Sequence, residues 1–238
     1  MKKISQLAWM PVSCLLLASL ANAQTIEEVG DPDSFGRDVT YLGLASVDPF
    51  YLQPNCAPVI EAGFQCLIPV QGQTTEFTSS MVDSIQLPSR ASNSLLCFAV
   101  TPSTSRRFGN TTTANGLAIL VTRALLTIES SVLQDPALID PTTGLPFDGK
   151  ISFTFTTNSE NRRIVPGDFD SRSTQLTRSC QGALVSKRAL TQIYGLTQSQ
   201  ANSFFNNRIT VKIGMSGTAR SVESLVHGVG LRLYGDRR

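Results

Sequence analysis

The sequence predicts a mainly β protein: an antiparallel β-sandwich of the jelly-roll or immunoglobulin-like kind, with a short two-helix insertion near residues 186–205. Two observations predict this class. Short segments of alternating apolar and polar residues recur along the chain, with Gly, Pro, Asn or Ser between them. Helix-capping signals cluster between residues 186 and 205, so regular alternation of strands and helices is not indicated.

The chain begins with the features of a bacterial-type secretory signal peptide, residues 1–23. Lys2 and Lys3 give a positive start, an apolar run follows, and small residues at 21–23 suit a signal peptidase. The apolar run is short of the roughly 20 residues that a membrane-spanning helix needs, which disfavours a retained span. We expect an exported protein of the periplasm or cell exterior, soluble after cleavage.

The predicted mature chain, residues 24–238, is expected to be a single domain with an extended lead-in at 24–37. Cleavage removes two lysines and no acids, so the basic count falls from 20 to 18 and equals the 18 acidic residues. A neutral chain argues against a nucleic-acid or anionic-membrane partner held by bulk charge.

Four cysteines remain in the mature chain: Cys56, Cys66, Cys97 and Cys180. Exported thiols oxidise, so two disulfides are expected. Three pairings are open, and we favour Cys56 with Cys66, which leaves Cys97 with Cys180. A zinc site is the alternative, but the sequence has no C-x-x-C and a single histidine.

The first half of the mature chain contains a series of short strand candidates, at residues 38–46, 65–70, 75–78, 81–87 and 94–101. Residues 117–130 are apolar enough for a buried helix or a long strand. Their Thr, Ile and Val content favours a strand, bent near Arg123. Residues 151–157 alternate cleanly, with Ile151, Phe153 and Phe155 on one face.

In the second half, Ser186 is predicted to cap a helix that stops at Gly195, and residues 197–200 have the T-x-x-Q form of a capping box. We expect the Phe204–Phe205 pair that follows to lie in the core. Two further strands are predicted at 208–215 and 222–234, with SGTARS between them as the turn of a hairpin.

Two similar acidic loops are the candidate metal sites. GDPDSFGR contains Asp31 and Asp33, and GDFDSR contains Asp168 and Asp170. Each loop places two carboxylates two residues apart after a glycine, and calcium requires several oxygens gathered in this way.

The alternative is that both loops are structural turns. The positions of Phe35 and Arg172 do not match the third ligand of an EF-hand loop, and Asp and Ser side chains often hydrogen-bond within turns. On this interpretation Arg37 and Arg172 pair with the neighbouring carboxylates. A hydrolase with paired carboxylates needs a cleft spacing that sequence does not supply.

Little else in the chain indicates catalysis or a cofactor. The lone histidine, His227, lies in an apolar strand, sharing one face with Val229, Leu231 and Leu233, so we expect a packed core residue. No resemblance to a known family is strong enough to name. The leading hypothesis is a non-enzymatic binding or assembly module of the cell envelope or exterior, with a protein partner or self-association. A calcium-dependent ligand-binding module, for instance for glycans, is the first alternative, and a hydrolase with paired carboxylates is the second.

Overall fold

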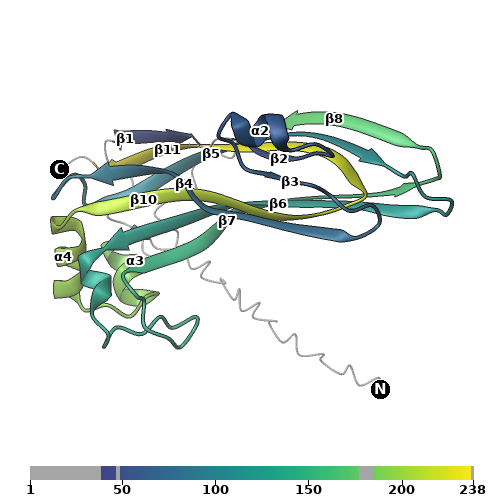
Figure 1. Cartoon of the computed structure of the whole chain (residues 1–238). Coiled ribbons are helices and arrows are strands. Elements are labelled where there is room, and N and C mark those ends of the chain that lie inside the picture. The colour runs from purple at the N-terminus through teal and green to yellow at the C-terminus, as the bar shows by residue number, and fades with distance from the viewer. Residues whose placement is uncertain (1–38, 47–48, 177–184, 237–238) are drawn as a thin grey trace, which may run out of the picture.

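The chain folds into two facing β-sheets, and the computed structural model describes residues 39–46, 49–176 and 185–236. Figure 1 shows the sheets as two stacked layers, with two short helices gathered at one end. This architecture confirms the predicted β-sandwich class and its two-helix insertion. The predicted signal peptide and lead-in lie outside the described residues.

The larger sheet has seven strands, with β11 and β5 at its centre, β3 and β8 at its edges, and β1 and β9 added to β11 and β5. Its strands are β1 (Val39–Ser46), β2 (Phe50–Leu52), β3 (Cys66–Leu67), β5 (Ser94–Gly109), β8 (Phe169–Gln175), β9 (Val185–Ser186) and β11 (Val222–Asp236). All pairings given for this sheet are antiparallel except that between β2 and β3, which is parallel.

The smaller sheet has four antiparallel strands in the order β4-β10-β6-β7. Its strands are β4 (Thr74–Leu87), β10 (Ile209–Arg220), β6 (Gly116–Ser130) and β7 (Lys150–Ile164). The helical elements are α2 (Ala57–Glu61), the 3-10 turn η1 (Ser131–Gln134), α3 (Lys187–Gln192) and α4 (Gln198–Asn206). In both sheets, neighbours in sequence are often not neighbours in space.

The apolar segment at 117–130 is a strand, as predicted, and forms most of β6. From Ala118 onward its residues alternate between buried and half-buried, which is the period of a strand with one face in the core. The pairing of β6 with β7 has a register shift between Ala124 and Leu125, close to the predicted bend at Arg123.

The two predicted helix starts are also confirmed. The Ser186 side chain accepts a 2.9 Å hydrogen bond from the backbone N–H of Ala189 at the start of α3. Thr197 and Gln200 form a reciprocal capping box at the start of α4. Between the two helices, Gly195 has a φ of +73°, a conformation that glycine adopts at low cost.

The predicted C-terminal hairpin is wrong, because β10 and β11 belong to different sheets. β10 pairs with β4 and β6, whereas β11 pairs with β1, β2 and β5. The strands meet at Ser221, whose φ of 52° turns the chain from one layer into the other. Most of the SGTARS segment, predicted as a turn, continues β10 to Arg220. Each strand buries one apolar face whether the two strands lie in different sheets or pair in the same sheet. The alternation of apolar and polar residues therefore could not distinguish these two arrangements.

Other strand boundaries also differ from the prediction. The 65–70 candidate shortens to β3, while the 75–78 and 81–87 candidates join into β4. The 94–101 and 151–157 candidates extend to Gly109 and Ile164. The added residues, 102–109 and 158–164, include charged side chains. Judged by composition alone, such segments are expected to be loops.

The core lies between the sheets and continues to the helical end. Phe50 and Phe77, from opposite sheets, stack with ring centroids 4.6 Å apart. Phe204 and Phe205 are both fully buried, which confirms their expected core position. The buried aromatic and aliphatic side chains form one cluster that joins the layers.

Gly217 on β10 should be intolerant of any side chain. A Cβ at this position would lie 2.3 Å from both the Val121 carbonyl oxygen and an atom of the Phe77 ring. We expect Gly217→Ala to lower the free energy of unfolding by about 1–3 kcal/mol in urea denaturation. Gly230→Ala is the control, because the nearest atom to its Cβ would be 3.9 Å away. Equal stability of the two variants would contradict this close packing.

Candidate functional site

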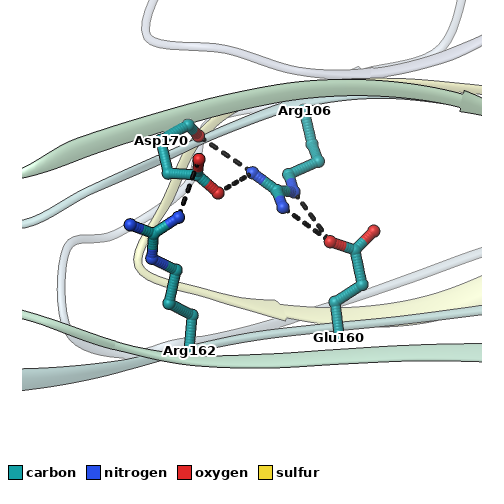
Figure 2. A network of polar contacts seen from close by, with 4 residues as sticks. All are labelled: Arg106, Glu160, Arg162 and Asp170. Atoms are coloured by element: carbon teal, nitrogen blue, oxygen red, sulfur yellow. Dashed lines mark hydrogen bonds and ion pairs between the residues drawn. The ribbon is translucent and has the colours of Figure 1, made fainter.

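A buried arginine joins the two sheets at the edge formed by β7 and β8. The Arg106 guanidinium, on β5, donates to Glu160 Oε2 on β7 at 2.6 and 3.1 Å and to Asp170 Oδ2 on β8 at 2.6 Å. It also donates to the Asp170 backbone carbonyl at 2.9 Å, and Arg162 of β7 pairs with Asp170 Oδ1 at 2.8 Å. Figure 2 shows Arg106 between the two acids, with Arg162 on the far side of Asp170. The network links one strand of the smaller sheet to two of the larger.

Strand alternation places Arg106 inside the sandwich. On β5, Thr104, Arg106 and Phe108 are all buried and face the opposite sheet. The Arg106 side chain is 4% exposed, and its guanidinium carbon lies 4.0 Å from the centre of the Phe108 ring. The ring supports the cation from one side while the acids satisfy its N–H groups.

A one-residue irregularity in β7 brings Glu160 and Arg162 to the inner face. Ala124 pairs with Thr156 and Leu125 with Thr154, so the register advances by one extra residue of β7 at this point. A single extra residue moves every later side chain to the other face of a strand. Beyond it, Glu160 lies opposite the buried Leu120 and faces inward.

The pKa values of the network follow from its geometry. Burial alone lowers the pKa of Arg106, but the hydrogen bonds and charges of Glu160 and Asp170 outweigh it, so the pKa is raised. The Arg106 hydrogen bond, followed by its charge and the contacts from Arg162, holds the pKa of Asp170 below its ordinary value despite opposing desolvation. Arg106 and Asp170 are therefore both charged at neutral pH.

The acidic segment at 167–172 is a turn only at its start, since β8 begins at Phe169, and its second carboxylate, Asp170, is held by arginines. The Asp168 backbone N–H donates to the Val165 carbonyl, and the Asp168 carbonyl accepts from Asn110. Asp170 pairs with Arg106 and Arg162 rather than with Arg172, the partner that the turn interpretation predicted. Among the described residues, no three His, Cys, Asp or Glu side chains gather as metal ligands. Calcium binding stays a prediction.

The other acidic loop, with Asp31 and Asp33, lies outside the described residues. Whether the two loops approach each other is therefore untested.

Sequence reasoning missed Arg106, Glu160 and Arg162. A signal for them exists: Ile151 and Ile164 are both buried but differ in parity, which requires a change of face within β7.

A solvent-open cleft of about 540 Å³ surrounds the network. Its charged lining consists of Arg106, Glu160, Arg162, Asp170 and Arg172. Both rims are edge strands, since β7 and β8 end their respective sheets. Charged side chains, in place of apolar ones, therefore fill this margin of the sandwich.

His227 is a core residue, as predicted. It is 1% exposed, and its Nδ1 lies 3.1 Å from the Ser103 carbonyl and 2.9 Å from Thr104 Oγ1. A carbonyl can only accept, so the neutral ring carries its proton on Nδ1. Burial lowers the pKa of His227 to about 4, partly offset by the Ser103 hydrogen bond.

The predicted Cys56–Cys66 disulfide is confirmed, with the two Cα atoms 5.6 Å apart. It lies within a segment, residues 53–72, that we call the cystine loop. The backbone N–H of Tyr51 on β2 donates to the Gln65 carbonyl and ties this loop to the sheet, and the N–H of Gln53 donates to the Leu67 carbonyl within the loop. The Cys97 side chain and Cys180 lie outside what the structure describes, so their pairing stays a prediction.

Comparison with known proteins identifies no family. No protein-family model and no curated protein matches the chain. A chain of the T13 viral particle of IBDV matches over 84% of this chain at 12% identity, with a TM-score of 0.21. A chain of the infectious bursal disease virus Gx strain matches at 11% identity, with a TM-score of 0.20. This chain covers 36% and 33% of those chains, and likeness this weak carries no argument.

Loss of Arg106 should be severe. Arg106→Met leaves Glu160 without its cation and Asp170 with only Arg162. A broken fully buried ion pair costs about 3–5 kcal/mol of unfolding free energy, and the partial exposure of the two acids should reduce the loss to about 2–3 kcal/mol. The matched control is Lys212→Met, which breaks the half-exposed pair with Glu129 and should cost under about 1 kcal/mol. Urea midpoints measure both, and losses of similar size would show that the network does not join the sheets.

His227 should make stability pH-dependent. Its folded pKa of about 4 lies below its unfolded value of about 6.5, so the unfolded chain takes up the proton first. Stability should fall by about 3 kcal/mol as pH drops from about 6.5 to about 4, with no further histidine contribution below that.

The slope of stability against pH is the readout for His227. His227→Gln, which cannot titrate, should abolish most of the slope between pH 6.5 and 5, whatever its effect on absolute stability. The chain has one histidine, so no other imidazole contributes. A variant that keeps the slope would assign it to carboxyl groups instead.

Proposed function

We propose that this protein is an exported, non-enzymatic β-sandwich that acts as a binding or assembly module of the cell envelope or exterior. The observation that carries this proposal is the apolar surface of the cystine loop. Four of its aliphatic side chains are exposed: Ile60 (60%), Leu67 (41%), Ile68 (60%) and Val70 (53%). Several exposed aliphatic side chains on one short segment are typical of protein-interaction sites.

These four side chains are not part of the hydrophobic core of the sandwich. Helix α2 contains no buried residue, although Val59 and Ile60 lie within it. The disulfide and the backbone bonds to β2 hold the loop in place, and Gln71 Nε2 adds a 3.0 Å bond to the Gly109 carbonyl. A surface held in one conformation loses little entropy on binding, which favours affinity.

The charges of the loop indicate a protein partner. Among residues 53–72, Glu61 is the single charged residue. An anionic membrane or a nucleic acid would require basic side chains, which this surface lacks. An apolar protein surface with a basic residue opposite Glu61 fits it better, either on a second copy of this chain or on another envelope protein.

Site-specific crosslinking tests the proposal in cells that export the protein. A photo-crosslinking amino acid at position 60 or 68 should give a discrete adduct, and the adduct mass distinguishes a second copy from a different protein. The control is position 145, where Leu145 is 64% exposed on a separate loop. Ile60→Ser together with Ile68→Ser should weaken the interaction at least tenfold by sedimentation or titration. Equal adducts at 60, 68 and 145 would refute the proposal.

A further inference from the structure

We propose that the cleft between β7 and β8 is an oxyanion-binding site, with Arg172 and Arg162 as the binding residues. The class of ligand is a carboxylate, phosphate or sulfate group. This site is separate from the cystine loop and does not depend on the function proposed for it.

The cleft has one positive charge more than its own acids neutralise. It is lined by three guanidinium groups, of Arg106, Arg162 and Arg172, and by the two carboxylates of Glu160 and Asp170. Both oxygens of Asp170 are already engaged, one with Arg106 and one with Arg162. Within residues 39–46, 49–176 and 185–236, Arg172 has no ion-pair partner.

The unpaired arginine lies directly opposite another arginine. In the antiparallel pairing of β5 with β8, Arg106 is the partner of Arg172, so both side chains are on the inner face. Directly opposed side chains have Cβ atoms about 4.5–5.5 Å apart, where like charges destabilise a sheet. An anion beside Arg172 would remove this repulsion.

The remaining donors of the cleft suit an oxyanion. No described residue bonds to the Arg172 guanidinium, and Arg162 gives one nitrogen to Asp170 while its side chain stays about half exposed. A guanidinium offers paired N–H groups that match two oxygens of a carboxylate, phosphate or sulfate. The buried network of Arg106 sets the position of Asp170, and through it that of Arg162, before any ligand arrives.

Calorimetric titration of the purified protein tests the site. The titrants are inorganic phosphate, inorganic sulfate and acetate, each at constant ionic strength in chloride. We expect saturable binding of at least one of these anions, and Arg172→Gln should weaken it at least tenfold. Arg163→Gln is the control, because Arg163 is the neighbouring exposed arginine of β7 and does not line the cleft. The anion affinity of Arg163→Gln should stay within twofold of the wild-type value. The preferred anion tells a phosphate or sulfate group from a carboxylate.

Thermal unfolding gives a second, independent readout. At about ten times its Kd, a bound anion should raise Tm by about 3–6 °C in the wild type and not in Arg172→Gln. Phosphate and sulfate also stabilise proteins generally, so the difference between the two proteins is the measured quantity. In chloride alone, Arg172→Gln should melt no lower than the wild type, because it removes the repulsion from Arg106. Lower melting in chloride, or equal anion affinity of the two arginine variants, would overturn the proposal.

Discussion

The contact on which one whole margin of this sandwich depends is the ion pairing of Arg106. A guanidinium 4% exposed to solvent would be very costly without partners, so its position is tolerable only because Glu160 and Asp170 meet it from different strands. These two strands end their respective sheets, and the described residues that line the cleft between them are charged or polar apart from Phe108. At this margin, hydrogen-bonded ion pairs connect the two sheets where apolar side chains connect them elsewhere.

Adjacent residues of β5 serve opposite sides of the larger sheet. Arg106 faces the inner network, while Arg107 faces outward, pairs with Glu223 and lies over the Phe169 ring at 4.6 Å. Arg107 and Glu223 also line a hollow of about 430 Å³ shared with Pro54, Pro69 and Gln71 of the cystine loop. A short stretch of one strand therefore contacts both the cleft and the base of the apolar loop, and places the two candidate surfaces at the same region of the fold.

Local signals in the sequence were sufficient for several elements. The strand at 117–130, the caps at Ser186 and Thr197, the buried pair Phe204–Phe205 and the short disulfide all depend on residues close in the chain, and each is confirmed. The pairing of the strands could not be predicted from such local signals. Strands β10 and β11 look like a hairpin because both alternate and are separated by small polar residues, yet a single residue, Ser221, carries the chain between layers.

The sequence by itself determined the class of fold and the places where strands, helices and the short disulfide form, because alternation, capping and cysteine spacing act over a few residues. Only the tertiary structure decided which strands pair and which charges meet. The face of Glu160 depends on a one-residue register shift between β6 and β7, and the contact of Glu160 with Arg106 joins positions 54 residues apart. Such contacts arise when the two sheets pack together. Alternation of apolar and polar residues along one strand does not specify which residue of another strand it meets.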